Sequence, residues 1–266
     1  MTVPAHPSEP ALRVSCTEGV ATVLLSRPGK MNAVSQAMWH DLVKAIEELE
    51  TDETVRVIIL RGAGDNFCAG ADIAEFDTVR RNAETARAYE NLNARAFAAI
   101  RNTRLPTIAA ISGVCFGGGF GLAAACDLRI STPDALFAIP AARLGLAYPV
   151  EAMGDIVATT GAQMARYLTF TGARIDAARA RECGFLLEIV PTDVLVSRAD
   201  EIAAMLAVNA PLSIHASKAS IAAALTSRAE DFSRAQGLGD ITFESADYAE
   251  GRSAFRERRP ARFKGR

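Results

Sequence analysis

The sequence has no clear excess of charge of either sign. Its 266 residues include 29 lysines and arginines against 31 aspartates and glutamates, which gives a formal net charge of -2 at pH 7. Proteins that bind nucleic acid usually carry a marked basic excess, because they neutralise phosphates. The balanced charge therefore argues against nucleic acid as a partner.

Long uninterrupted apolar runs are also missing. A membrane-spanning helix needs about 20 mostly apolar residues, whereas the alanine-rich segments of this chain are broken by charges, as in GARIDAARARECG at 172–184. The first ten residues, MTVPAHPSEP, contain three prolines and have neither the basic nor the apolar part of a secretory signal. We therefore expect no membrane contact and a disordered lead-in over residues 1–10.

Cysteine and histidine are too few and too scattered for a disulfide framework or a metal site. The five cysteines are odd in number and form no C-x-x-C pair, so we expect reduced thiols in a cytoplasmic protein. No grouping of His, Cys and Asp has the spacing of metal ligands, and the sequence predicts no metal. Cys68 and Cys115 show no paired base that would make either a nucleophile.

What the sequence does have is an alternation of strand-like and helix-like segments. Apolar, β-branched runs at 55–62 and 105–113 are typical of buried parallel strands. Residues 36–50 carry apolar side chains at helical spacing after Ser35, a residue type favoured as an N-cap. These segments predict an α/β fold.

The last part of the chain has a different pattern. From about residue 161 the sequence is expected to be wholly helical, and residues 194–206 and 212–225 carry apolar faces that an α/β core does not readily cover. Such faces usually find a partner in another copy of the chain. We therefore expect a core over residues 11–193 and a helical region over 194–266 that mediates oligomerisation.

Three consecutive glycines, Gly117 to Gly119, stand where the strand 105–113 ends and a helix rich in alanine and leucine begins. Glycine lets the backbone approach a ligand closely, and the first N–H groups of a helix have no partner within it. A second glycine turn, in NFCAGADIAEF at 66–76, follows the strand 55–62. Two such turns after parallel strands either aim two N–H groups at one point, as in an oxyanion hole, or are ordinary tightly packed turns.

The segments RPGKMNAVS at 27–35, NFCAGADIAEF at 66–76 and ISGVCFGGGFGLAAACDLRIS at 111–131, in this order, closely resemble the crotonase, or enoyl-CoA hydratase/isomerase, family. The resemblance extends from about residue 12 to residue 266. It implies the crotonase (ClpP/crotonase-like) fold, in which repeated ββα units surround a two-walled β core and C-terminal helices mediate trimerisation. It also implies an acyl-CoA thioester as substrate, with coenzyme A as part of that substrate and no separate cofactor.

The resemblance assigns a role to each of several residues. The N–H groups of Ala71 and Gly118 would hold the thioester oxygen. Asp72 and Lys264 each have a plainer alternative, as a helix cap and as a solvated lysine near the C-terminus. The residues implied in substrate binding are Arg27, Lys30, Met31, Gly70, Asp72, Ile73, Gly117, Ala141, Tyr148, Phe263 and Lys264.

Both glutamates of the family's hydratase pattern are missing. By the resemblance they would stand two residues after the third glycine and just after a later proline, where this chain has Gly121 and Ala141. Neither residue transfers a proton, and acid–base catalysis contributes about 10²–10⁴ in rate. Glu151 is a candidate acid, or simply an acid favoured by the dipole of the next helix. Tyr148 either hydrogen-bonds the acyl group or packs as an ordinary aromatic.

The sequence therefore predicts an acyl-CoA-processing enzyme of this family that stabilises a thioester enolate. Because both positions lack a carboxyl group, we expect poor hydration of short 2-enoyl-CoAs. A decarboxylase of a malonyl-type CoA thioester and a non-catalytic acyl-CoA-binding protein are the alternatives. The predicted assembly is a homotrimer or a dimer of trimers.

Overall fold

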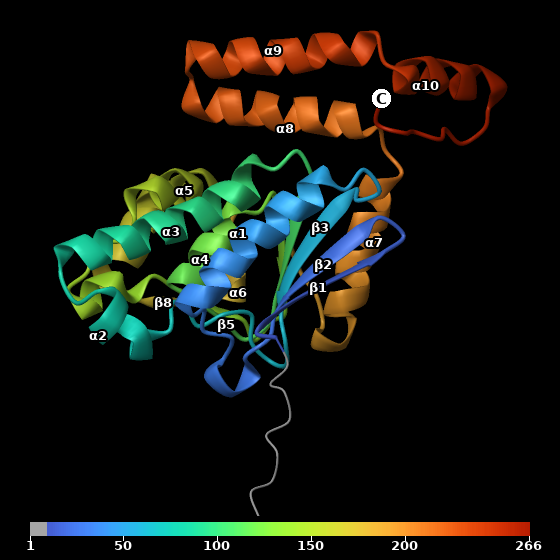
Figure 1. The fold of residues 1–266 in the computed structure, drawn as a ribbon. Coiled ribbons are helices and arrows are strands. Elements are labelled where there is room, and N and C mark those ends of the chain that lie inside the picture. The colour runs from blue at the N-terminus through green and yellow to red at the C-terminus, as the bar shows by residue number, and fades with distance from the viewer. Residues whose placement is uncertain (1–9) are drawn as a thin grey trace, which may run out of the picture.

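The computed structural model describes residues 10–266, so His6 and all of the expected lead-in except Pro10 lie outside the described residues. Two sheets form the core. The larger has six strands in the order β1-β2-β3-β4-β6-β9, and the smaller has the order β5-β7-β8. Figure 1 shows helices packed around these sheets, with α8 and α9 standing apart from them.

The large sheet is parallel from β2 to β9, and β1 pairs with β2 as an antiparallel hairpin. Side chains alternate across β3, so that Ile58 and Leu60 join the main core while Val57 and Ile59 face the other side. Because the parallel strands end at one edge, the loop after β3 lies beside β5, which follows β4 and leads into the glycine triplet. The strands are β1 Leu12–Thr17, β2 Val20–Leu25, β3 Val57–Gly62, β4 Thr107–Ile111, β5 Val114–Phe116, β6 Leu128–Ser131, β7 Leu136–Ala138, β8 Arg174–Asp176 and β9 Glu188–Ile189.

Helix α1 packs on one face of the large sheet with α3 beside it, and α7 covers the other face (Figure 1). The predicted cap of α1 is confirmed, because Ser35 Oγ accepts a hydrogen bond from the Met38 N–H at 3.3 Å. The helices are α1 Gln36–Thr51, α2 Phe76–Val79, α3 Ala83–Asn102, α4 Gly118–Ala125, α5 Val150–Thr171, α6 Ala177–Glu182, α7 Leu195–Ala207, α8 Pro211–Thr226, α9 Ala229–Phe243 and α10 Ala246–Glu257.

The prediction of a wholly helical chain after residue 161 was wrong. Strands β8 and β9 lie in that region, where they pair with β7 and β6. Strands β5 and β7 were not predicted either. Each of these four strands has three residues or fewer, which is too short to show an alternation of period two.

The apolar face expected at 194–206 is covered within the chain, because Leu195, Ala199 and Ile202 of α7 pack against β3, β4 and β6. Helices α8, α9 and α10 differ from α7 because they keep large apolar side chains exposed. These side chains are Ile221, Leu225, Phe232, Ile241, Phe243 and Phe255. The domain division at residue 194 and its role in oligomerisation remain predictions. Within residues 10–266, no helix combines the length and the apolar character needed to cross a membrane.

Candidate active site

The loop after β3 is held on both sides by main-chain pairing. Cys68 forms an isolated parallel bridge with Cys115, and Ala71 forms one with Val34. The Val34 N–H donates to Gly70 O at 2.8 Å, and the Asp72 N–H donates to Val34 O at 2.9 Å. In this parallel pattern the residues on either side of Ala71 make the hydrogen bonds, so the N–H of Ala71 points away from Val34.

The two glycine turns are in contact at this edge of the sheet. Gly70 has a φ of +102°, and a Cβ placed on it would lie 2.9 Å from Phe116 O and 3.2 Å from Gly118 N. A Cβ on Gly118 would lie 3.4 Å from Ala71 N. The structure therefore brings Ala71 and Gly118 together, and only glycine fits at position 70 without strain.

Both of these N–H groups are available. Gly118 is the first residue of α4, so its N–H has no acceptor within the helix. Within residues 10–266, neither this group nor the Ala71 N–H donates a hydrogen bond. The positive end of the α4 dipole lies at the same point, which favours negative charge there.

Tyr148 fixes the orientation of the Gly118 donor. Its hydroxyl donates to Gly117 O at 2.7 Å, and the Gly121 N–H donates to the same oxygen at 3.1 Å. The Gly117 carbonyl and the Gly118 N–H belong to one trans peptide and point in opposite directions. Burial raises the pKa of Tyr148 well above its usual value, so the hydroxyl keeps its proton. Tyr148 thus bonds to the backbone of the glycine turn.

The position of the first missing glutamate is filled by other side chains. A Cβ on Gly121 would lie 2.6 Å from Tyr148 Oη and 2.7 Å from Phe97 Cζ. No side chain fits there unless Tyr148 and Phe97 move. Ala141, at the second position, lies half-buried in the short helix η3 Pro140–Leu144. The structure therefore offers no room for a carboxyl at position 121 in this arrangement.

Asp72 anchors the turn before α1 to the loop after β3. Its carboxylate accepts from Arg27 Nη2 at 2.9 Å, from Lys30 Nζ at 3.1 Å and from the Ala74 N–H at 3.2 Å. Burial would raise the pKa of Asp72, but the hydrogen bonds from the two cations outweigh it and lower this pKa. The interpretation of Asp72 as a cap is confirmed, because it caps the short helix η2 Ile73–Glu75. The predicted binding residues Met31 and Ile73 are 49% and 59% exposed beside it.

Glu151 is an exposed residue in the first turn of α5. Its carboxylate makes no hydrogen bond or ion pair to another of residues 10–266, and the N-cap of the helix is Pro149. This position agrees with the plainer interpretation of Glu151 as an acid placed where the helix dipole favours it.

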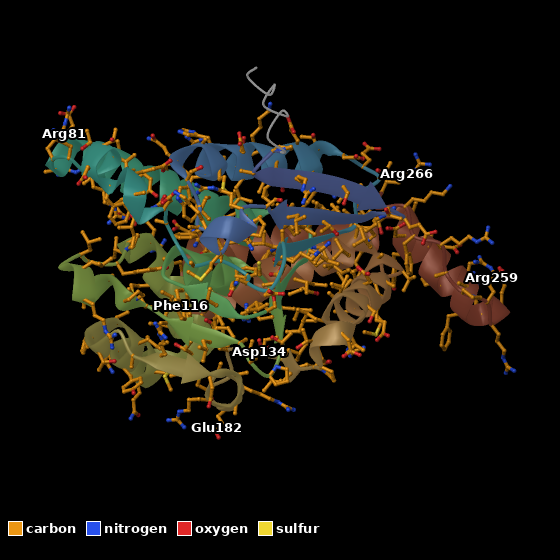
Figure 2. The ribbon with its side chains drawn as sticks, turned by 90° about the horizontal axis from the view of Figure 1, so that it is seen from below. Arg81, Phe116, Asp134, Glu182, Arg259 and Arg266 are labelled. Carbon is orange, nitrogen blue, oxygen red and sulfur yellow. The ribbon has the colours of Figure 1, made fainter. Side chains whose placement is uncertain are left out.

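Phe263 and Lys264 lie far from the two turns within one chain. The N–H groups of Lys264 and Gly265 donate to the Asp247 carboxylate at 2.6 and 2.8 Å, and Phe263 O accepts from Arg56 at 3.4 Å. Arg56 precedes β3, whereas the Ala71 loop follows its other end. In Figure 2, Arg266 is likewise well separated from Phe116, which comes just before the glycine triplet.

A wall of α1, α2 and α3 side chains beside the turns was missed. Trp39 Nε1 donates to Tyr89 Oη at 3.0 Å, and the Trp39 ring would lie 3.0 Å from a Cβ on Gly118. Arg80 pairs with Glu90 at 2.6 Å. The α3 sequence held a signal for Asn93, a polar residue on an otherwise apolar face, but none for Glu90. The apolar residues of that face are Tyr89, Leu92, Ala96, Phe97 and Ile100.

The cysteines near the turns are poor nucleophiles. Burial raises the pKa of Cys68 to about 12 and raises that of Cys115 well above its usual value, so both thiols stay protonated near neutral pH. Among residues 10–266, no group of three or more His, Cys, Asp or Glu side chains is arranged to hold a metal ion.

Comparison with known proteins agrees with this architecture. The family model described as enoyl-CoA hydratase/isomerase matches residues 15–266. The structure of an enoyl-CoA hydratase/carnithine racemase from Magnetospirillum magneticum superposes with a TM-score of 0.90 at 33% identity, covering 97% of each chain. The short-chain-enoyl-CoA hydratase of Clostridium acetobutylicum is 34% identical over 76% of this chain and 77% of its own length. The mitochondrial Delta(3,5)-Delta(2,4)-dienoyl-CoA isomerase of Rattus norvegicus is 31% identical over 80% and 68%.

These matches show that the chain has the crotonase fold, and its two sheets and C-terminal helices belong to that fold. The chain belongs to the enoyl-CoA hydratase/isomerase family and is an enzyme of that family.

Proposed function

We propose that this enzyme binds an acyl-CoA thioester and holds its carbonyl oxygen between the N–H groups of Ala71 and Gly118. The observation that carries the proposal is the contact between the two glycine turns, with both N–H groups free of other acceptors in residues 10–266. Negative charge grows on the thioester oxygen when the α-carbon gains carbanion character. Donors fixed at that oxygen stabilise the enolate without rearranging during the reaction.

The residues around the turns support coenzyme A as part of the substrate. Lys30 keeps half of its side chain exposed while it pairs with Asp72, and it adds positive charge at the entrance to the turns. Met31 and Ile73 expose apolar surface beside it. Together they suit a ligand that is both anionic and partly apolar, and the adenine and phosphates of coenzyme A have this character.

The positions of Phe263 and Lys264 link substrate binding to assembly. Within one chain these residues lie at the other end of β3 from the turns, so contact with coenzyme A requires the C-terminal segment of a second copy. The exposed apolar side chains of α8, α9 and α10 favour such an assembly. We expect a trimer or a dimer of trimers in sedimentation equilibrium, and a species of 28.2 kDa, the mass of one chain, would contradict this.

The chemistry that fits best proceeds through the enolate without a water held between two carboxylates. Gly121 and Ala141 provide no carboxyl, and Tyr148 fills the space at the first position. A double-bond shift in an enoyl thioester needs only enolate stabilisation and one proton-transfer group. Decarboxylation of a malonyl-type thioester also uses the enolate, and it is the second reaction to be screened.

Calorimetry and substrate screening test this function. We expect CoA thioesters to bind more tightly than free CoA, and mass spectrometry with 3-enoyl-, 2-enoyl- and malonyl-type CoA panels to show turnover in the first or third panel. Rapid hydration of crotonyl-CoA would mean that a replacement acid pair exists. Absence of binding by every CoA thioester would overturn the proposed function.

A further inference from the structure

Three buried polar atoms without a hydrogen-bond partner in residues 10–266 come from one short stretch of structure. They are Arg80 Nε, Glu90 Oε2 and Asn93 Oδ1. Arg80 ends α2, and Glu90 and Asn93 lie one turn apart on α3. Buried polar atoms are normally paired, so three exceptions together indicate a wall that faces a polar or reacting group.

This wall lies beside the glycine turns. Asn93 is only 5% exposed, and Tyr89 and Phe97 lie one turn before and after it on α3. The Tyr89 hydroxyl holds Trp39, whose ring packs against Gly118, and Phe97 packs against Gly121. The α3 face that carries Asn93 is therefore fixed at both ends to residues that touch α4.

Glu90 has one oxygen held and one oxygen free. Its Oε1 pairs with Arg80 Nη2 at 2.6 Å, and the Arg80 guanidinium lies over the Phe76 ring at 4.3 Å. Its Oε2 is buried and has no partner among the described residues. A buried carboxylate oxygen without a partner is unfavourable, so a ligand group that enters between α3 and α4 would supply the missing interaction.

The electrostatic surroundings connect Glu90 with the site. Burial raises the pKa of Glu90, the Arg80 charge opposes this effect, and the Glu151 carboxylate adds to it. The Glu90 charge in turn contributes to the raised pKa of Tyr148, which bonds the Gly117 carbonyl. The geometry agrees, because Glu90, Asn93 and Phe97 lie on successive turns along one face of α3, and Phe97 lies against Gly121 of α4.

We propose that Glu90 is the proton-transfer residue of this enzyme, acting through its free Oε2 on the acyl chain held at Ala71 and Gly118. The assignment rests on the proposed function. It supplies the carboxyl that Gly121 and Ala141 lack, from a different helix.

One carboxylate is enough for a double-bond shift. Glu90 Oε2 takes a proton from the α-carbon C2 of a 3-enoyl thioester. The electron pair of that C–H bond forms a C1–C2 double bond and the carbonyl π pair moves to the thioester oxygen, which gives a dienolate whose C3–C4 double bond is intact. The negative charge lies on the thioester oxygen, between the two N–H donors. The C3–C4 π pair then takes the proton back from Glu90 at C4, the C1–C2 pair moves to form the C2–C3 double bond, and the oxygen lone pair restores the carbonyl. The product is a 2-enoyl thioester, and no other reactant is consumed.

Exchange of the α-hydrogen for deuterium tests the assignment apart from the overall reaction. Butyryl-CoA and a 3-enoyl-CoA are incubated with the enzyme in D₂O, and the label is followed by mass spectrometry. We expect Glu90→Gln to lose exchange and isomerisation by about 100-fold or more, while calorimetric affinity for butyryl-CoA changes less than about threefold. Glu47→Gln, at an exposed position of α1, is the matched control and keeps wild-type rates.

The outcomes separate the two proposals. A wild-type enzyme that neither binds nor exchanges any CoA thioester contradicts the proposed function itself. A wild-type enzyme that exchanges, with Glu90→Gln equally fast, overturns the assignment of Glu90 and leaves the function intact. Should Glu90→Gln fail to fold, Glu90→Asp and Arg80→Gln decide. Both variants are expected to change the pH at which the exchange rate rises. If this pH is the same as in the wild type for both variants, the assignment is contradicted.

Discussion

The two sides of the site use different parts of the chain. On the α4 side the groups that we propose to face the ligand are the main-chain N–H groups of Ala71 and Gly118, which two glycine turns bring together. On the α3 side the proposed groups are the side chains of Glu90 and Asn93, each with a buried oxygen that has no partner in residues 10–266. Main-chain donors depend on turn geometry and close approach, which only small residues permit. An acidic side chain needs only to extend into the space beside the bound acyl group. Any helix that borders this space can therefore carry it.

The largest effect is expected from removing a donor on the main-chain side. Gly118→Pro deletes the N–H at the first position of α4, where proline breaks no helical hydrogen bond. Its ring requires a small shift of Trp39, because a Cβ at this position lies 3.0 Å from the Trp39 ring. Loss of one such donor lowers turnover by about 10²–10³. We expect this loss in kcat/KM on whichever CoA thioester proves to be turned over.

Ala229→Pro is the matched control for that change. Ala229 is an exposed residue at the first position of α9, so the same chemistry is altered far from the site. Circular dichroism checks that both variants fold. Equal rates in Gly118→Pro, Ala229→Pro and the wild type would mean that the Gly118 N–H is not a donor to the substrate.

A smaller effect is expected where a side chain supports the main-chain donor. Tyr148→Phe removes the hydrogen bond to Gly117 O, which is worth about 0.5–1.5 kcal/mol. We expect kcat to fall several-fold while KM changes little, because the freed peptide still reaches the substrate but is less well oriented. The exposed Tyr167→Phe should leave both constants unchanged, and a purely structural role for Tyr148 would lower the melting temperature without changing kcat.

The role of Glu90 as a base is tested by the pH dependence of the exchange rate. As a base Glu90 must be ionised, so the exchange rate should rise with pH through a pKa above the usual value of 4.5 for glutamate. Arg80 lowers that pKa, so Arg80→Gln moves the rise to higher pH. Glu151 raises it, so Glu151→Gln moves the rise slightly to lower pH. A pH profile that neither change affects would show that these side chains take no part in catalysis.

The raised pKa of Glu90 also affects the stability of the folded protein. The pKa of Glu90 is higher in the folded protein than in the unfolded chain, so the folded state binds more protons between the two values. The stabilisation linked to this group is present below the unfolded pKa and is lost as pH rises through the folded one. Chemical unfolding should therefore show the wild type losing stability relative to Glu90→Gln as pH rises over this interval.

The smallest effect concerns the filled position of the missing glutamate. Gly121→Ala places a Cβ 2.6 Å from Tyr148 Oη, and such overpacking costs about 1–3 kcal/mol. Gly237→Ala is the control, because a Cβ at that position in α9 meets no atom within 4 Å. That change should stabilise the protein by about 0.5–1 kcal/mol. Equal melting temperatures for the two variants would show that the space at position 121 is open.

The difference between the two sides also explains what the sequence predicted. Gly70 and Gly117 to Gly119 each come after a predicted buried strand. The order of residue types along the chain was therefore enough to predict two glycine turns close to each other. Strands of two or three residues, such as β8 and β9, leave no periodicity and were missed. Glu90 was missed because a polar residue on a helix is ordinarily solvated, and only the structure shows that its Oε2 is buried.

The central claim is that the thioester oxygen accepts hydrogen bonds from Ala71 and Gly118, and the carbonyl stretch of a bound acyl-CoA tests it most directly. Infrared difference spectra of butyryl-CoA with and without ¹³C at the thioester carbon isolate this band. The account predicts a shift to lower frequency on binding to the wild type and to Ala229→Pro, and a smaller shift with Gly118→Pro. A band that stays at its solution frequency in the wild-type complex, or shifts equally in Gly118→Pro, would contradict it.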